Sequence, residues 1–364
     1  MADPLSDPKL LASTGLTGKH LLLGTVLAVQ ANYYRVQLDP TAQTLPATEL
    51  LCTRRSRLKK IGQQVMVGDR VGVEEPDWAG QRGAIAEVLP RQTQLSRPPV
   101  ANADQILLVF ALAEPHPDPY QLSRFLVTAE TTGLEVVLCL SKADLVSEPE
   151  EQQWCDRLQQ WGYEPLLISL LTQQGLGELT SQLGGHLSVV SGPSGVGKSS
   201  LINQLIPLAN SRVGQVSQAG RGRHTTRHVE LFGLPAGGLL ADTPGFNQPA
   251  LVMTPTELVH CFPEARQRLA IATCQFSDCL HREEPNCAVR GDWERYPHYL
   301  DFLAEVLAQT AQQHAMRETE PTLKRKTGTQ GQNRYEPKLQ TKTYRRPSRR
   351  TQQQDLQQLY RETE

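Results

Sequence analysis

One octapeptide in this sequence has the composition and spacing of a phosphate-binding loop. Residues 192–199 read G-P-S-G-V-G-K-S, which matches G-x-x-x-x-G-K-[ST], and an apolar run before it and a helical pattern after it supply the required context. In such a loop backbone N–H groups surround phosphate oxygens, Lys198 reaches the β- and γ-phosphates, and the Ser199 hydroxyl binds Mg²⁺. The alternative is a glycine-rich turn without a ligand. We expect a nucleotide to be bound by Gly192, Pro193, Ser194, Gly195, Val196, Gly197, Lys198, Ser199 and Ser200.

A second short motif, Asp242-Thr243-Pro244-Gly245, follows the apolar run 238–241 and reads D-x-x-G. We expect Asp242 behind the Mg²⁺ ion and the N–H of Gly245 within reach of a γ-phosphate. Phosphate loops of this kind also occur in guanylate kinases and ABC-type ATPases, so these two motifs leave the base undetermined.

The base is indicated by Ser141-Lys142-Ala143-Asp144, which directly follows the strand-like run 136–140 and resembles the [NT]-K-x-D motif of GTPases. A carboxylate at Asp144 can accept the N1 and N2 hydrogens of guanine, for which adenine has no equivalent pair. Two charge-assisted hydrogen bonds of about 1.5 to 3 kcal/mol each would separate the bases by orders of magnitude. The stem of Lys142 would pack over the ring, while Ser141 stands where Asn is common.

The order of these motifs predicts a rearranged domain. Ile168-Ser169-Leu170 resembles the S-A-x loop that completes a guanine site, with Leu in place of Ala. In ordinary GTPases the base-recognition motifs come last, whereas here they precede the phosphate loop. We therefore expect a circularly permuted GTPase domain that binds GTP and GDP, with D-x-x-G as its last element.

The elements that must position these motifs fall into three folded parts. Short strand-like runs between 21 and 95 predict a small barrel, of which an OB-type barrel is the favoured kind. Its expected strands are 22–29, 33–38, 64–67, 70–73 and 83–88. From 106 onward, apolar runs at 106–112, 136–140, 166–169 and 187–191 alternate with helical stretches, which predicts a doubly wound parallel sheet. After 249 the pattern is helical, with an amphipathic face formed by Tyr296, Tyr299, Leu300, Leu303, Val306 and Leu307.

Charge is unevenly distributed, although the net charge is only -1. A basic loop between two barrel strands could contact a nucleic-acid backbone or form an ordinary solvated face; it contains Arg54, Arg55, Arg57, Lys59 and Lys60. A basic C-terminal arm, expected to be disordered until it meets a partner, contains Lys324, Arg325, Lys326, Arg334, Lys338, Lys342, Arg345, Arg346, Arg349 and Arg350.

Three cysteines and a histidine lie within one short segment. The spacing Cys274-x4-Cys279-x-His281-x5-Cys287 supplies three thiolates and one imidazole, a set that suits tetrahedral Zn²⁺. Four protein ligands leave no open position, so we expect one structural Zn²⁺ ion, the alternative being metal-free thiols. The remaining cysteines are expected to be ordinary buried thiols: Cys52, Cys139, Cys155 and Cys261.

Together, an OB-type barrel, a permuted GTPase domain and a cysteine cluster resemble the RsgA (YjeQ) family of small-ribosomal-subunit biogenesis GTPases, from about Leu21 to about Leu307. The resemblance implies the small (30S) ribosomal subunit and its rRNA as partners, a role in late maturation, and ribosome-stimulated hydrolysis of GTP to GDP. It also implies that residues 220–226 form switch I, where Thr225 or Thr226 meets Mg²⁺ and the γ-phosphate.

The water-positioning residue has to be found outside D-x-x-G. Ras-like GTPases use a glutamine just after that motif, but Phe246 stands here and cannot hydrogen-bond water. We expect His224 to take this part, with contact to RNA or solvent as the alternative, and with Thr225 and Thr226 beside it. The chain alone should therefore be a slow GTPase.

The predicted fold is multidomain: an N-terminal OB-type β-barrel, a central α/β circularly permuted P-loop GTPase domain and a C-terminal, mostly helical zinc module. The expected divisions are 1–20 disordered, 21–97 RNA-binding barrel, 98–250 GTPase domain, 251–312 zinc module and 313–364 basic tail. Apolar runs of only strand length and the lack of a signal-peptide pattern predict a cytoplasmic protein without a membrane partner. We also expect the protein to be a monomer. Two other functions stay open: a nucleoside monophosphate kinase fused to an RNA-binding tail, and an RNA-binding protein with a vestigial GTPase.

Overall fold

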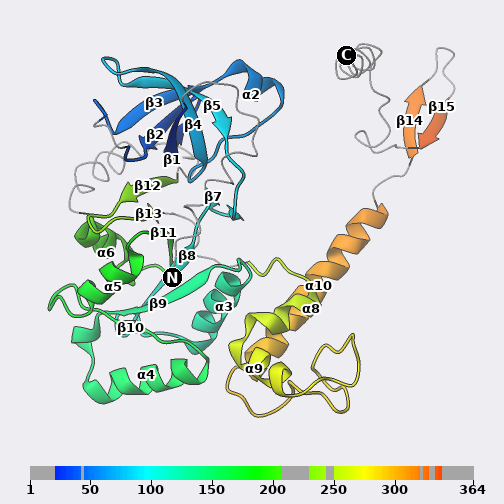
Figure 1. Ribbon diagram of the computed structural model, residues 1–364. Helices are drawn as coiled ribbons and strands as arrows, with labels where there is room; N and C mark the ends of the chain where they lie inside the picture. The colour runs from blue at the N-terminus through cyan, green and yellow to red at the C-terminus, as the bar shows by residue number, and fades with distance from the viewer. Residues whose placement is uncertain are drawn as a thin grey trace. The chain divides into compact units, whose positions relative to one another are not determined.

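The computed structural model describes residues 21–41, 45–206, 229–242, 250–319, 323–327 and 333–337. The chain divides into two compact units, 1–303 and 304–364 (Figure 1). The first unit holds the barrel, the nucleotide-binding sheet and the cysteine cluster.

The N-terminal barrel has five strands: β1 (Leu22–Gln30), β2 (Tyr33–Leu38), β3 (Glu49–Arg54), β4 (Arg70–Asp77) and β5 (Arg82–Val88). They follow the order β1-β2-β3-β5-β4, and pairing of β1 with β4 closes the barrel. Alternate residues of each strand fill its core, among them Val26, Val36, Leu50, Val71 and Ile85. The predicted small barrel is confirmed, and the structure shows that it is closed.

Two details of the barrel differ from the sequence prediction. Residues 64–67 were predicted as a strand but form none, and Val67 makes only a single bridge, to Val100. The strand that the prediction missed is β3, in which the buried residues Leu50 and Cys52 alternate with more exposed ones. The predicted basic loop is largely a short helix, α2 (Ser56–Lys60), because Leu58 anchors it to the barrel core. The structure thereby orders most of this basic segment.

The central sheet has the order β10-β9-β8-β11-β13-β12, and its strands are β8 (Gln105–Ala111), β9 (Glu135–Ser141), β10 (Leu166–Leu167), β11 (Leu187–Ser191), β12 (Glu230–Gly233) and β13 (Leu239–Asp242). All neighbours pair in parallel except β12, which runs antiparallel to β13. A short hairpin, β6 (Gln94–Ser96) with β7 (Pro99–Ala101), precedes the sheet.

Helices cover both faces of this sheet, so every residue of β8 is buried. One face packs against α3 (Pro119–Glu130) and α4 (Glu148–Gln160), and the other against α5 (Leu176–Leu183) and α6 (Lys198–Leu205). The expected doubly wound parallel sheet is confirmed, and the carboxyl ends of its strands meet at one edge, where ligands bind in such folds.

The C-terminal region is helical, as predicted. It contains α8 (Pro255–Leu258), a 3₁₀ turn η4 (Val259–Cys261), α9 (Pro263–Ile271), the cysteine-bearing loop and α10 (Tyr296–Thr319). The helix α10 continues past the boundary expected at 312. In the second unit, β14 (Leu323–Thr327) pairs antiparallel with β15 (Asn333–Pro337), within the segment expected to form the basic tail.

Candidate functional site

The phosphate loop joins the end of β11 to the start of α6, as its spacing predicts. Gly192 has φ +141°, and a Cβ there would lie 2.1 Å from the carbonyl oxygen of Val109, so a side chain is excluded. Gly197, with φ +94°, is the N-cap of α6. The Lys198 ammonium donates to the carbonyl oxygens of Gly192, at 2.8 Å, and Pro193. It therefore lies within the loop, where phosphate oxygens would be bound.

The guanine-type motif begins at the end of β9, beside this loop. The buried Ser141 hydroxyl lies 2.6 Å from the carbonyl oxygen of Val196 and 3.1 Å from that of Phe110. Lys142 has φ +58°, an uncommon conformation for a side-chain-bearing residue, and its ammonium donates to the carbonyl of Glu114. Ser141 thus fastens the base-recognition loop to the phosphate loop with its hydroxyl.

The exposed Asp144 carboxylate lies next to the third predicted segment. Its Oδ1 accepts a hydrogen bond from Ser169 Oγ at 2.5 Å, and its Oδ2 has no donor among the described residues. The Ala143 N–H donates to the carbonyl of Ile168 at 3.1 Å, which joins the two segments through the backbone. The segment Ile168-Ser169-Leu170 therefore lies beside the guanine-type motif, and Ser169 orients the Asp144 carboxylate.

These segments line one cavity of about 250 Å³. Side chains of the base-type motif meet the phosphate loop there, and apolar side chains form the rest of the wall: the lining residues are Ser141, Lys142, Asp144, Leu145, Ile168, Leu170, Leu171, Val196, Gly197, Ser200 and Leu201. A planar base bounded by apolar atoms, with a carboxylate at its edge, fits such a cavity. Leu145 and Leu171 were not predicted as lining residues, because neither belongs to a nucleotide-binding motif that can be recognised in the sequence.

Only some of the residues expected to act in hydrolysis lie within the described part of the chain. Asp242 ends β13, where it pairs with Glu230, and nothing further is described of it. His224, Thr225, Thr226 and Gly245 lie outside the described residues. Ser199, proposed for Mg²⁺, is exposed in the first turn of α6.

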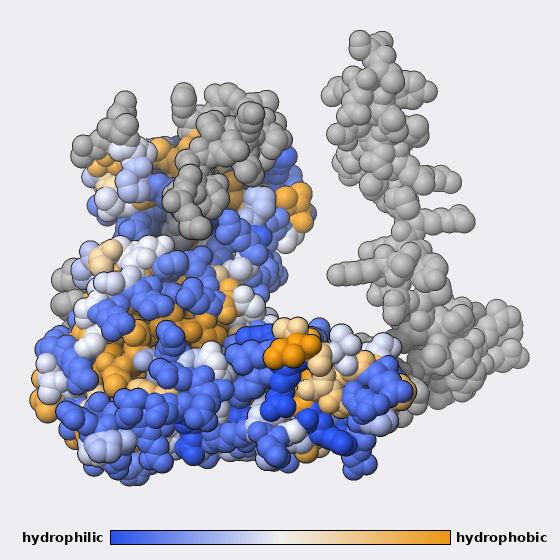
Figure 2. All heavy atoms as spheres, turned by 60° about the horizontal axis from the view of Figure 1, so that its bottom comes forward, coloured by the Kyte–Doolittle hydropathy of each residue, from blue (hydrophilic) through white to orange (hydrophobic). Residues whose placement is uncertain are grey.

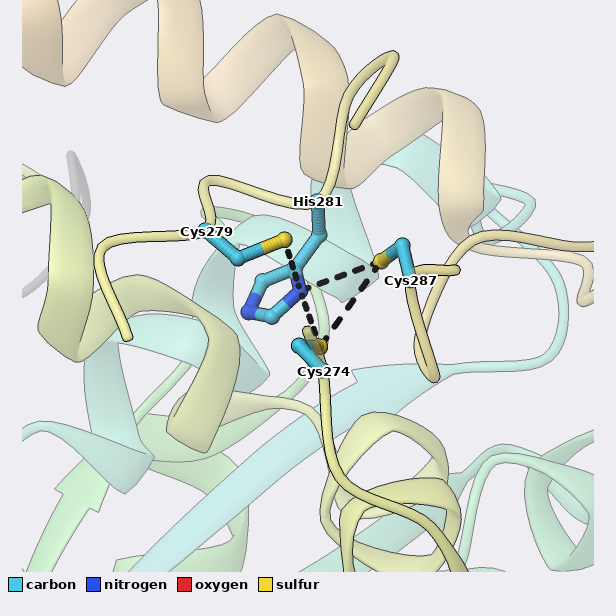
Figure 3. A group of neighbouring side chains, drawn as sticks. All are labelled: Cys274, Cys279, His281 and Cys287. Atoms are coloured by element: carbon cyan, nitrogen blue, oxygen red, sulfur yellow. Dashed lines mark hydrogen bonds between the residues drawn. The ribbon is translucent and has the colours of Figure 1, made fainter. Parts of the chain in front are cut away.

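The predicted cysteine cluster is assembled in three dimensions (Figure 3). One possible ligand atom from each of Cys274, Cys279, His281 and Cys287 lies within 4.8 Å of the others. His281 Nδ1 is 3.5 Å from the sulfurs of Cys274 and Cys279 and 3.3 Å from that of Cys287. The Cys274 and Cys287 sulfurs are 4.0 Å apart. The group can hold a metal ion.

Its dimensions and protonation suit a tetrahedral thiolate site. With metal–sulfur bonds of about 2.3 Å and metal–nitrogen bonds of about 2.0 Å, tetrahedral angles place sulfurs about 3.8 Å apart and nitrogen about 3.5 Å from sulfur. Burial lowers the pKa of His281, which favours the neutral, metal-binding ring. Burial raises the pKa of Cys279 to about 12, so metal binding there must displace a proton. Backbone N–H groups of Ala288 and Arg290 donate to the sulfurs of Cys274 and Cys287.

The other cysteines stay outside the cluster. Cys52, Cys139 and Cys261 are buried, as expected, and burial raises the pKa of all three thiols. Cys155 on α4 is only half-buried, so the prediction that it is a buried thiol is wrong.

A buried arginine holds the cysteine-bearing region against the nucleotide-binding domain, a feature that sequence reasoning missed. Arg295 is fully buried and pairs with Glu264 through Nε at 2.7 Å and through Nη2. Its guanidinium carbon lies 4.8 Å from the ring centroid of Trp161, at the end of α4, and 4.9 Å from that of Phe262. Trp161 Nε1 donates to Glu294 at 2.8 Å. The cation thus joins α4 to the segment between α8 and α10.

Comparison with known proteins agrees with this architecture. The sequence profile of the RsgA GTPase family matches residues 88–252. The chain is 64% identical to the small ribosomal subunit biogenesis GTPase RsgA of Trichormus variabilis, covering 94% of this chain and 98% of the relative. It is 42% identical to the mitochondrial RsgA 1 of Arabidopsis thaliana, covering 95% and 87%.

Two solved structures share the fold. YloQ, described as a circularly permuted GTPase, superposes with a TM-score of 0.66 at 30% identity, covering 80% of this chain and 96% of its own. YjeQ from Thermotoga maritima superposes with a TM-score of 0.66 at 32% identity, covering 79% and 99%. The predicted permuted arrangement is confirmed.

Figure 2 shows a face on which hydrophilic residues predominate and hydrophobic residues form separate patches. Among the helices of the described ranges, none combines the length and apolar character needed to cross a membrane.

Proposed function

Since this chain belongs to the RsgA GTPase family, we propose that its hydrolysis of GTP to GDP and phosphate serves the late maturation of the small (30S) ribosomal subunit. The observation that carries the nucleotide assignment is the cavity in which Asp144 faces the start of α6. Segments that lie far apart in the chain, 141–144 and 196–201, meet in this cavity, which supports the binding of a guanine beside its phosphates.

In this proposal each part of the site has one task. Asp144 accepts the N1 and N2 hydrogens of guanine, Ser169 orients that carboxylate, and Lys142 covers the ring. The loop 192–197 and Lys198 hold the phosphates. Mg²⁺, bound through Ser199 and Thr226, would neutralise phosphate charge, and Asp242 and Gly245 would sense the γ-phosphate.

Hydrolysis itself requires a positioned water. We assign this role to His224, because Phe246 follows D-x-x-G and cannot hydrogen-bond. Thr225 and Thr226 share the same segment. Docking on the small subunit would bring this segment to the γ-phosphate and raise turnover.

For the cysteine cluster we propose a single Zn²⁺ ion. Three sulfurs and one imidazole nitrogen form the donor set that Zn²⁺ prefers, and four protein ligands leave no position for substrate. The ion stabilises the loop between α9 and α10.

We further propose that the barrel, 21–97, binds rRNA, and that the protein works as a monomer in the cytoplasm. Within α2, Arg57, Lys59 and Lys60 are exposed, whereas Arg55 pairs with Glu74 and Glu75. The exposed cations are therefore available to a phosphate backbone.

The test is GTP turnover by the full chain, measured alone and with purified small ribosomal subunits. We expect slow turnover alone and a rise of roughly 10³-fold or more with subunits, comparable in kind to activation by a GTPase-activating protein. Lys198→Ala should lose both activities. Transfer of the γ-phosphate to a nucleoside monophosphate would support the kinase alternative, and subunit binding without any turnover would support a vestigial GTPase.

A further inference from the structure

The strand β12 connects the nucleotide-binding sheet to the barrel, because it pairs with a strand of each. The short hairpin β12–β13 lies between the segment assigned to switch I, 220–226, and the D-x-x-G motif that begins at Asp242. On one side β12 pairs with β13, and on the other it pairs with β1 of the barrel, so the two sheets form one continuous sheet (Figure 1).

Glu230 occupies the junction of the two sheets. Its Cα lies opposite Asp242 of β13 and, across the other edge of β12, opposite Ala28 of β1. A displacement of Glu230 would therefore shift both Asp242, the first residue of D-x-x-G, and strand β1 of the barrel.

A barrel arginine holds the Glu230 side chain. Arg35 on β2 donates from Nη2 to Glu230 Oε1 at 2.5 Å, and its Nε lies 3.5 Å from Glu49 Oε2. About a quarter of each side chain in the Arg35–Glu230 pair is exposed, at 23% and 27%, so water screens this ion pair only in part.

Apolar packing around the pair makes β12 part of both domains. Val229 and Leu231 are buried in one cluster that includes Leu27 of the barrel and Val189 of β11. The pairing of β1 with β2 is irregular between Val26 and Ala28, so Leu27 joins this shared cluster while Val26 fills the barrel core. The irregularity in β1 therefore lets the barrel pack against β12 through Leu27.

We propose that Arg35 is a positioning residue for GTP hydrolysis: by holding Glu230, it fixes the exit of switch I relative to Asp242 and makes turnover responsive to docking of the barrel. The inference rests on the proposed function, because it uses the assignment of 220–226 and D-x-x-G. Arg35 acts through Glu230 and touches no part of the nucleotide cavity.

The first experiment compares Arg35→Gln with Arg70→Gln in the full chain. Arg70 is a matched control, since it also forms a barrel ion pair, but with Asp39 of the barrel itself. For Arg35→Gln we expect kcat with small subunits to fall about tenfold, a typical size for coupling between sites, with KM for GTP unchanged and unstimulated turnover retained. Arg70→Gln should retain stimulation. Undiminished stimulation in Arg35→Gln, or equal losses in both variants, would overturn the proposal.

A charge exchange separates positioning from loss of fold. In a Glu49→Gln background, Arg35→Glu should lose stimulation, and adding Glu230→Arg should restore much of it, because the ion pair is rebuilt with reversed polarity. Failure of this rescue would contradict a role that depends on the pair.

A measurement without ribosomes distinguishes this inference from the proposed function. Amide hydrogen exchange in β1 and β12 is compared between GDP and a non-hydrolysable GTP analogue. In the wild type we expect the nucleotide to change protection of both strands, and in Arg35→Gln to change β12 but not β1. If subunits fail to stimulate the wild type, the ribosomal function is wrong while this coupling stands; if β1 responds equally in both proteins, the coupling is wrong.

Discussion

Arg295 and Glu264 form a two-point ion pair in the protein interior: the arginine side chain is fully buried and the glutamate side chain is 9% exposed. The aromatic rings of Trp161, Tyr163 and Phe262 surround the cation. Trp161 and Tyr163 follow α4, whereas Phe262 precedes α9. The ion pair therefore holds the cysteine-bearing region against α4.

Breaking this pair should be costly. Arg295→Met leaves Glu264 as a buried, unpartnered acid and should lower the free energy of unfolding by about 3 to 5 kcal/mol. Arg295→Met combined with Glu264→Leu should recover most of that loss, because no charge is then buried. The Arg157–Glu294 pair, whose side chains are 33% and 38% exposed, is the control, and Arg157→Met should cost about 1 kcal/mol or less. Urea unfolding followed by tryptophan fluorescence measures all three; a double variant no more stable than Arg295→Met would contradict this account.

The base specificity should reside in Asp144. Asp144→Asn should weaken GTP binding and favour xanthosine triphosphate, because a carbonyl replaces the guanine N2 amine and an amide can donate to it. The loss of a charge-assisted pair predicts about a tenfold or greater decrease in GTP affinity. Titrations with both nucleotides measure the change, with Asp156→Asn on the exposed side of α4 as control. Unchanged guanine preference in Asp144→Asn would remove this residue from the base site.

Ser141 should matter for nucleotide affinity although it is buried. Ser141→Ala leaves the carbonyl of Val196 without the hydroxyl that lies 2.6 Å away, at a cost of about 1 to 3 kcal/mol. We expect weaker GDP and GTP binding to an equal extent, since the fastening acts on the loop and not on the γ-phosphate. A titration calorimetry result with wild-type affinities would show that the two loops hold their positions without this contact.

The cysteine cluster should bind one equivalent of Zn²⁺. Cys287→Ser should lose it, whereas Cys155→Ser, outside the cluster, should keep it. Because the thiols must lose protons, and burial raises the pKa of Cys279 to about 12, metal affinity should rise with pH and fall in acid. Elemental analysis and chelator competition between pH 6 and pH 8, roughly the range below the ordinary thiol pKa, test both points. Wild-type protein free of zinc would end the assignment.

His224 should account for stimulated turnover. His224→Ala should lose most of the acceleration by small subunits, by about 10² to 10⁴-fold, while retaining nucleotide and subunit binding. His186→Ala is the control, because His186 precedes β11 and so lies at the end of that strand away from the phosphate loop. Equal single-turnover rates in the wild type and His224→Ala would exclude this histidine from the reaction.

The features predictable from sequence are those encoded within a few neighbouring residues. The loop at 192–199 and the spacing of Cys274 to Cys287 each carry their chemistry locally, and the apolar runs of the sheet follow from burial on both faces. The order of the motifs predicted the permutation because topology fixes which strand ends meet.

Contacts between domains had no such signal. Arg295 reads as a surface cation in the sequence, and only the packing of Trp161 and Phe262 around it makes burial favourable. The sequence likewise does not indicate that Arg35 and Glu230 form an ion pair, because they come together only when β1 pairs with β12. The predicted strand 64–67 was wrong because alternating Val65 and Val67 pack from an irregular segment, which periodicity alone does not distinguish from a strand.

The continuous sheet also imposes an order on biosynthesis. The barrel strands are translated first, but the partner of Ala28 on β12 is made only after the chain has been extended to Glu230. Until then β1 presents an edge with unpaired backbone groups, and Leu27 lacks the shared cluster formed with Val189 and Leu231. Folding of the first unit therefore includes a long-range closure between β1 and β12, and the edge of the nascent barrel can mispair until β12 has been made.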